Sequence, residues 1–172
     1  MKINKLYRLF RYDWPLHFML ALTNWLPDNV VFLKLRGLIC RPFFGRAGKL
    51  LIGRNVTFYN PSKIFIGDNV YFALGTWLCA DAPIEIGSNV LFGPYVVVVT
   101  SNHSILNGSY MFGGHSKLQK VVIDDGSWIA AHVTILSGCS VGGCSLIAAN
   151  SVLNMNTETN SIYGGVPAKR LK

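Results

Sequence analysis

Aliphatic residues recur at every sixth position, without a slip, along the last third of the chain. They are Ile123, Ile129, Ile135, Val141, Ile147 and Leu153. The fourth residue after each of the first five is small or short, and the residue directly after an anchor is often Gly or Ala. Neither the 3.6-residue period of a helix nor the two-residue period of a strand fits this spacing. The pattern predicts a coil of short parallel strands, in which each repeat buries its apolar side against the next.

The same spacing occurs less regularly between residues 52 and 98, and it contains three near copies of Ile-Gly-x-Asn-Val at 52–56, 66–70 and 86–90. Gly after the anchor suits a tight corner, and Asn tolerates left-handed backbone angles. Two offsets of two residues, before Ile66 and before Ile86, are predicted to be small bulges at corners.

The repeat stops after Val98 and resumes at about Val121, which leaves a predicted loop at residues 100–120. Long insertions between repeats usually serve a function. His103 stands where the loop begins, three residues after the end of a β-branched run at 96–100. A neutral imidazole accepts a proton from a hydroxyl near neutral pH, so His103 is the candidate general base.

The chain has 172 residues, 51% of them hydrophobic, and a formal net charge of +8. This predicts one domain at residues 49–172, with a tail at 156–172, and a helical extension at residues 1–48. Residues 1–54 hold ten Lys or Arg and two Asp, whereas the remainder holds six basic and six acidic residues. No motif typical of nucleic-acid recognition accompanies this basic segment, so we expect no nucleic-acid partner.

The basic, aromatic-rich extension has two further interpretations that the sequence leaves open. It caps the end of the coil, or it caps the coil and also contacts an anionic membrane through residues 1–45. Ile3, Leu6, Tyr7 and Phe10 share one side of a first helix, and a second helix is expected from Pro27-Asp28 to about Cys40 with Val31, Leu35 and Leu38 on one face. The apolar stretch at 14–26 is too short to span a bilayer and lacks a cleavage site.

The four cysteines, Cys40, Cys79, Cys139 and Cys144, have no Cys-x-x-Cys spacing. We expect buried, reduced thiols and a cytoplasmic protein, peripheral at the inner membrane face if the extension contacts lipid.

Residues 50–172 resemble the hexapeptide-repeat acyltransferases, in particular the galactoside and maltose O-acetyltransferases and the surface-polysaccharide O-acetyltransferases. The likeness rests on the repeats, on the seventeen positions that separate Ile86 from His103, on the coil at 122–142, and on the ending Gly165-Val166-Pro167-Ala168-Lys169. The resemblance implies an all-β fold, the left-handed parallel β-helix, with roughly five coils of three hexapeptides. It also implies a homotrimer with acetyl-CoA as acyl donor and His103 as the catalytic base.

The resemblance further implies a cofactor groove between neighbouring subunits. Trp128, Ala131 and Ala149 would line the pantetheine arm, while Lys169 and Lys172 would meet phosphates as point charges. Asp81 would accept hydrogen bonds from the acceptor sugar. Simpler roles stay open for these residues: Trp128 as a packing anchor between subunits, the two lysines as a solvated terminus, and Asp81 as a turn residue.

Two positions differ from the galactoside enzymes, and one further histidine faces outward. Ala73 replaces an asparagine of the galactoside enzymes in the acceptor region, and Met155 replaces a lysine near the cofactor. These departures put the same acceptor in doubt and weaken the phosphate site. His132 takes an outward repeat position, which favours a surface or interface role.

The sequence thus predicts an acetyl-CoA-dependent O-acetyltransferase acting on a sugar hydroxyl in surface-polysaccharide or lipid-linked glycan synthesis. A small free sugar or a xenobiotic is the alternative acceptor. A non-catalytic trimeric scaffold and a carbonic-anhydrase-like metalloenzyme are rival functions. The metalloenzyme needs three converging histidines, and His17, His103, His115 and His132 include no pair five apart, so no metal is expected.

Overall fold

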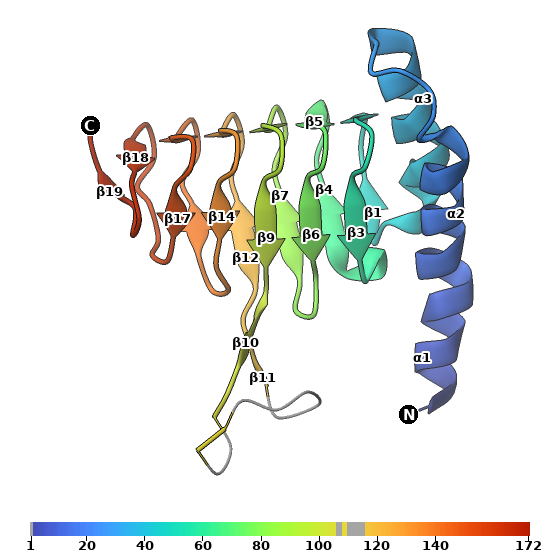
Figure 1. Cartoon of the computed structure of the whole chain (residues 1–172), viewed down its shortest axis with the longest axis horizontal. Helices are drawn as coiled ribbons and strands as arrows, with labels where there is room; N and C mark the ends of the chain where they lie inside the picture. Colours follow the sequence, from blue (N-terminus) through green and yellow to red (C-terminus); the bar gives the residue numbers. More distant parts are fainter. Residues whose placement is uncertain (1, 106–107, 110–115) are drawn as a thin grey trace.

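The computed structural model describes residues 2–105, 108–109 and 116–172. The chain winds into a left-handed parallel β-helix, a prism with three sheet faces, and helices cover one end of it (Figure 1). Face 1 holds β2 (Leu50–Ile52), β5 (Val70–Phe72), β8 (Leu91–Phe92), β13 (Trp128–Ile129), β16 (Leu146–Ile147), β18 (Ile162–Gly164) and β19 (Lys169–Arg170). Face 2 holds β3 (Thr57–Tyr59), β6 (Trp77–Cys79), β9 (Val97–Val99), β14 (Thr134–Ile135) and β17 (Val152–Leu153). Face 3 holds β1 (Arg46–Ala47), β4 (Ile64–Ile66), β7 (Ile84–Ile86), β12 (Val121–Ile123) and β15 (Ser140–Val141).

The helical layer at the end of the prism is a rod followed by a second helix. The rod comprises α1 (Lys2–Arg8), the π-helical turn η1 (Leu9–Asp13) and α2 (Trp14–Thr23). It is followed by α3 (Val30–Cys40) and the 3₁₀ turns η2 (Arg41–Phe43) and, within the prism, η3 (Pro61–Lys63). In the described part of the chain no helix is both long enough and apolar enough to cross a membrane.

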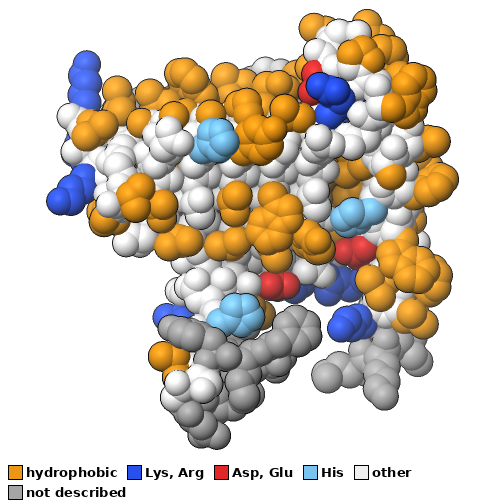
Figure 2. Space-filling model, viewed as in Figure 1, with side chains coloured by type: hydrophobic (Ala, Val, Ile, Leu, Met, Phe, Trp, Pro, Cys, Tyr) orange, Lys and Arg blue, Asp and Glu red, His pale blue; other side chains and the backbone are white. Residues whose placement is uncertain are grey.

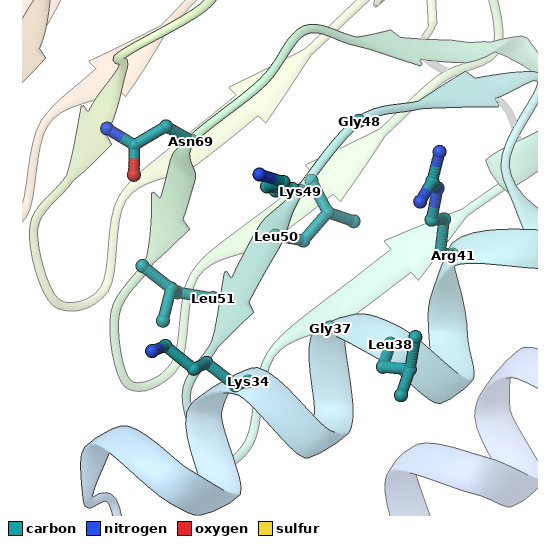
Figure 3. Close-up of a pocket in the computed structure, with 9 residues that line it drawn as sticks. All are labelled: Lys34, Gly37, Leu38, Arg41, Gly48, Lys49, Leu50, Leu51 and Asn69. Carbon is teal, nitrogen blue, oxygen red and sulfur yellow. The ribbon is translucent and has the colours of Figure 1, made fainter.

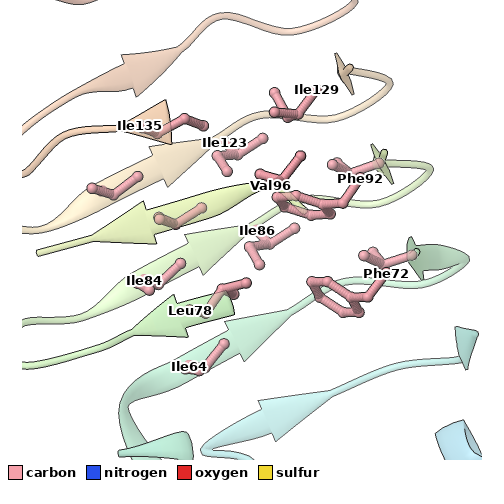
Figure 4. Close-up of a cluster of buried hydrophobic side chains, with 14 of the residues drawn as sticks. Ile64, Phe72, Leu78, Ile84, Ile86, Phe92, Val96, Ile123, Ile129 and Ile135 are labelled. Carbon is pink, nitrogen blue, oxygen red and sulfur yellow. The ribbon is translucent and has the colours of Figure 1, made fainter. Parts of the chain in front are cut away.

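The six-residue period corresponds to the buried positions of the prism, as predicted. The anchors from Ile123 to Leu153 are all fully buried, and the small residues between them, such as Ser127 and Ser151, also point inward. Figure 4 shows Ile123, Ile129 and Ile135 inside the prism, next to anchors of the earlier coils such as Ile86 and Phe92. The Asn residues of the three near-copy segments, Asn55, Asn69 and Asn89, have φ of 57°, which confirms left-handed corners.

The two offsets in the period are not bulges, so this prediction was wrong. β4 and β7 pair without an extra residue, Ile64 with Ile84 and Ile66 with Ile86. Both ends of each strand point inward, so one strand contributes two anchors two residues apart. The early coils are therefore 20 residues long, as in the pairing of Leu78 with Val98. The later coils keep 18 residues, as in the pairing of Ile135 with Leu153.

An aromatic column fills the end of the prism that the helices cover. Phe44 packs edge-on against Phe58, Phe58 against Phe72, and Phe72 stacks on Phe92, with ring centroids 4.8 to 5.2 Å apart. Such aromatic pairs stabilise a core beyond the contribution of apolar burial alone. Phe44 lies directly after η2, so the segment that leaves the helical layer also closes the core.

A buried arginine joins the helices to the first coil. Arg36 is 1% exposed; its guanidinium pairs with Asp28 at 2.8 Å and donates to the carbonyl of Ile52 at 3.1 Å and that of Thr23 at 3.3 Å. A buried charge is tolerated only with such a full set of partners. This residue therefore holds α2, α3 and β2 together and adds no charge to the surface.

The second helix differs from the prediction at its start. It begins at Val30 rather than at Pro27-Asp28, because the side chain of Asn29 caps it by accepting from the Phe32 N–H at 3.1 Å. Gly37 faces β2, where a Cβ would lie only 2.0 Å from the Leu50 carbonyl oxygen. The apolar face predicted for this helix, which includes Val31 and Leu38, is exposed to solvent.

The insertion and the tail are more regular than predicted. β10 (Ser101–His103) and β11 (Ser116–Leu118) form an antiparallel hairpin that projects from the prism between β9 and β12. In the tail, β18 adds a rung to face 1, and β19 folds back to pair with it.

Replacing Ile135 by Ala should lower the free energy of unfolding by about 2–5 kcal/mol, because it leaves a cavity in a fully buried rung. Chemical denaturation measures the change. The matched control is Thr134→Ala in the same strand, whose half-buried side chain points outward; a change within about 0.5 kcal/mol is expected there. Equal stability of the Ile135→Ala variant and the parent would contradict the assigned register.

Candidate active site

The hairpin leaves the prism at the corner between faces 2 and 3, and a buried threonine fixes this corner. The Thr100 hydroxyl donates to the Cys79 carbonyl and accepts from the Ala82 N–H, both at 2.9 Å. Its side chain is fully buried. The root of the hairpin is therefore bonded to the equivalent corner of the preceding coil, at residues 79–82.

Asp81 lies on that corner with a partner for each carboxylate oxygen. Ser101 Oγ donates to Oδ2 at 2.8 Å, and Asn60 Nδ2 donates to Oδ1 at 3.2 Å. The ammonium of Lys63 donates to the backbone carbonyl of Asp81. Burial, together with the nearby Arg8 charge, lowers the pKa of Lys63, and the Asp81 charge opposes that shift. These contacts fix the position of the Asp81 carboxylate.

His103 lies at the same corner, two residues beyond Ser101. It is exposed, and its backbone pairs with Ser116 across the hairpin. Residues i and i+2 of a strand project to the same side, roughly 7 Å apart. Because Ser101 is bonded to Asp81, His103 stands two strand positions beyond the residue that contacts this carboxylate. His103 and Asp81 therefore belong to the same corner of the prism.

The cysteines partly differ from the expectation of buried thiols. All four are free; Cys40 and Cys139 are buried, Cys79 is half-buried, and Cys144 is exposed. Burial, followed by the Asp81 charge, raises the pKa of Cys79 to about 11. The protonated thiol donates to Asp81 Oδ2 at 3.7 Å.

The residues predicted to line the cofactor lie on face 1 and at the corner between faces 1 and 2. Trp128 is 51% exposed on β13, between Leu91 and Leu146 of the neighbouring strands. Ala131 and Ala149 follow at the corner of successive coils, where the Asn150 N–H donates to the Ala131 carbonyl at 3.0 Å. Because both side chains are methyl groups, no large side chain projects from these two positions of the corner.

His132 lies at the same corner, whereas Lys169 and Lys172 lie at the end of the prism. His132 is exposed and stacks on Tyr95 with centroids 5.1 Å apart, in line with a surface role. Lys169 and Lys172 are exposed on the last rung, next to the ion pair of Arg170 with Glu158 at 2.7 Å. Of the two departures, Met155 is 47% exposed, whereas Ala73 is buried.

The two groups of residues do not meet within one chain. His103 and Asp81 follow face 2, whereas Trp128 and Ala131 precede it, so the strands of face 2, such as β9 and β14, separate them (Figure 1). A single prism therefore presents these two groups, which we call the candidate half-sites, on different corners.

Sequence reasoning missed Asn60, Lys63 and Ser101 as neighbours of Asp81. Their signal was the length of the early coils, because Asn60, Asp81 and Ser101 are 21 and 20 residues apart. Over the described residues, no group of three or more His, Cys, Asp or Glu side chains is arranged to hold a metal ion. His115, one of the four histidines considered for a metal site, lies outside the described residues.

Comparisons with known proteins place this architecture among acetyltransferases. No protein-family model matches the chain. The galactoside O-acetyltransferase of Escherichia coli K12 is 29% identical over 125 residues, which cover 68% of this chain and 57% of that protein. A putative lipopolysaccharide biosynthesis O-acetyl transferase of the same organism is 26% identical over 129 residues, which cover 70% and 66%. The chain thus spans little more than half of the first relative.

A solved structure agrees over most of the chain. The hexapeptide-repeat acetyltransferase of Vibrio cholerae, crystallised with acetyl-coenzyme A, superposes with a TM-score of 0.76 at 28% identity, covering 91% of this chain and 86% of that one. The chain is similar to the hexapeptide-repeat acetyltransferases in sequence and in fold, so the predicted resemblance and the predicted fold are confirmed.

Replacing Thr100 by Val should cost about 1–3 kcal/mol of stability, because the Ala82 N–H loses its buried acceptor and the Cys79 carbonyl its hydroxyl donor. Thermal and chemical denaturation measure the loss. Thr100→Ser keeps the hydroxyl and should retain most of the stability. If the Val variant were as stable as the Ser variant, the corner would not depend on these bonds.

Proposed function

We propose that this protein is an O-acetyltransferase that moves an acetyl group from acetyl-CoA to a hydroxyl of a sugar. The observation that carries the proposal is the position of His103 at the root of the hairpin, two residues beyond Ser101, whose hydroxyl is bonded to the Asp81 carboxylate. The proximity of a proton acceptor and a hydrogen-bond acceptor at one exposed corner suits recognition and activation of a hydroxyl group.

In the proposed mechanism, His103 accepts the proton of the acceptor hydroxyl as its oxygen attacks the acyl carbon, and returns that proton to the departing sulfur. The donor supplies an acetyl group already activated as a thioester. Asp81 orients the acceptor: a carboxylate offers about four lone-pair positions, and Ser101, Asn60 and Cys79 occupy three. One position remains for a sugar hydroxyl.

We further propose that the active unit is a homotrimer, in which the two half-sites of neighbouring prisms meet. The corner at Ala131 and Ala149, where no large side chain projects, has the exposed Trp128 beside it and fits a thin, flexible pantetheine arm. Lys169 and Lys172 at the end of the prism are suited to contact the phosphates of CoA. The named V. cholerae homologue was crystallised with acetyl-coenzyme A, which supports this choice of donor.

For the acceptor we propose a surface polysaccharide or a lipid-linked glycan. One relative is named for lipopolysaccharide biosynthesis, and the basic helical layer of this chain suits a sugar carried on an anionic lipid. An acceptor of that kind would meet the enzyme at the membrane surface.

His103→Ala should lower kcat by about 10²-fold or more, because the general base is lost, while the affinity for acetyl-CoA stays unchanged. Calorimetric titration with acetyl-CoA and steady-state assays on candidate glycans measure the two quantities. Lys117→Ala, at an exposed position on the partner strand of the same hairpin, is the control and should keep its turnover. Normal turnover of the His103→Ala variant would refute the assignment.

The double variant Lys169→Ala/Lys172→Ala should bind acetyl-CoA roughly tenfold more weakly at low salt, since each lysine contacts phosphate as a point charge. Acetyl-pantetheine, which lacks the nucleotide phosphates, should bind both forms equally. Arg170→Ala removes a neighbouring charge that is already paired with Glu158 and serves as control. A uniform loss for both ligands would contradict a phosphate role.

A further inference from the structure

The rod of the helical layer is apolar on two opposite sides. Leu16, Leu20 and Thr23 of α2 face the first coil and are buried. A second stripe at four-residue spacing points away from the prism, and its members are 56 to 63% exposed: Phe10, Trp14, Phe18 and Leu22. A helix that is hydrophobic all round is normally covered on every side. The prism covers only one.

The outer apolar stripe continues beyond the rod. Trp25, 77% exposed, follows α2, and α3 adds Val31, Leu35 and Leu38 at positions i, i+4 and i+7. Figure 2 shows hydrophobic side chains along the edge of the helical layer that faces away from the prism. We call these eight residues the outer face. Contiguous apolar surface of this kind marks an interaction site.

The charges around the outer face are of one sign. Exposed cations occur throughout the extension: Lys5, Arg11, Lys34, Arg41, Arg46 and Lys49. Both acids of residues 1–54 are engaged internally, because Asp28 pairs with Arg36 and Arg54, and Asp13 accepts from the Asn60 N–H at 3.1 Å. A second copy would bring cation against cation, whereas an anionic surface is complementary.

A groove between α3 and β2 adjoins the outer face. It encloses about 350 Å³; Leu38, Leu50 and Leu51 give it an apolar floor, and three cations line it, Lys34, Arg41 and Lys49 (Figure 3). Among the described residues, none of these cations forms an ion pair with a carboxylate. Leu38 belongs to both the groove and the outer face, so one ligand can contact both.

We propose that the outer face binds an anionic phospholipid bilayer. Its aromatic and aliphatic side chains enter the boundary between headgroups and acyl chains, and the cations of the groove contact lipid phosphates. The helical layer lies across one end of the prism, so the prism stands out from the bilayer. This surface is separate from both half-sites, and its binding does not depend on acetyl transfer, although a lipid-linked acceptor would give it a purpose.

Flotation of the full chain with vesicles tests the proposal. Vesicles of phosphatidylcholine alone should bind weakly, and vesicles with about 30% phosphatidylglycerol strongly, with binding that weakens as salt rises. Phe18→Gln/Leu22→Gln and Lys34→Glu/Lys49→Glu should each reduce anionic-vesicle binding roughly tenfold or more, since the first removes apolar area that the bilayer would bury and the second replaces cations by anions. All four side chains are exposed, so the fold should be retained, and thermal denaturation checks this.

The controls are an exposed apolar residue and an exposed cation far from the helices. Val166→Gln in the tail, 70% exposed in the parent, and Lys117→Glu on the hairpin should bind vesicles like the parent. His103→Ala should also bind normally, so loss of transfer and loss of lipid binding are distinguished. Absence of anionic-vesicle binding, or equal binding by all variants, would overturn the proposal. So would self-association that Phe18→Gln/Leu22→Gln abolishes, because it would assign the outer face to a second copy.

Discussion

The burial of one coil against the next is the interaction on which this protein depends. A single coil has no interior of its own; Phe72 is buried only because Phe58 and Phe92 lie on either side of it. Such a stack has two open ends where the core would meet water. Here the helical layer closes one end through Leu16, Leu20 and Phe44, and Arg36 bonds that layer to the first coil. At the other end, β18 adds a rung and β19 pairs with it.

The same architecture determines where chemistry is possible. The backbone groups of the three faces are bonded between coils, and inward side chains fill the core, so the corners and the outward positions remain for ligands. His103 and Asp81 occupy one corner, while Ala131 and Ala149 occupy another. Under the proposed function, the base and the acceptor site lie at one corner and the donor site at the other, so two prisms would have to meet for the reaction. Assembly would then be a condition of activity.

Much of the prism could be predicted from the sequence, since each anchor has a fixed chemical signature at a fixed interval. The interval itself was misjudged in the early coils, because Ile64 and Ile66 belong to one strand with two inward positions. That error hid the neighbours of Asp81, which lie a coil of about twenty residues away. For the helices the limit of prediction was different. Periodicity identifies the apolar face around Val31 and Leu38, but it does not show whether the rest of the protein or a separate partner covers that face.

The way in which the hairpin joins the prism has a consequence for how such proteins diversify. The Gln119 N–H bonds to the Thr100 carbonyl at 3.0 Å, which closes the base of the hairpin, and β12 then resumes pairing with β7 in register. The stack is therefore indifferent to what the chain does beyond that closed base. The hairpin can therefore change in length or sequence between its two roots while every rung of the core stays in register, and under the proposed function such changes would act on the acceptor side of the site alone.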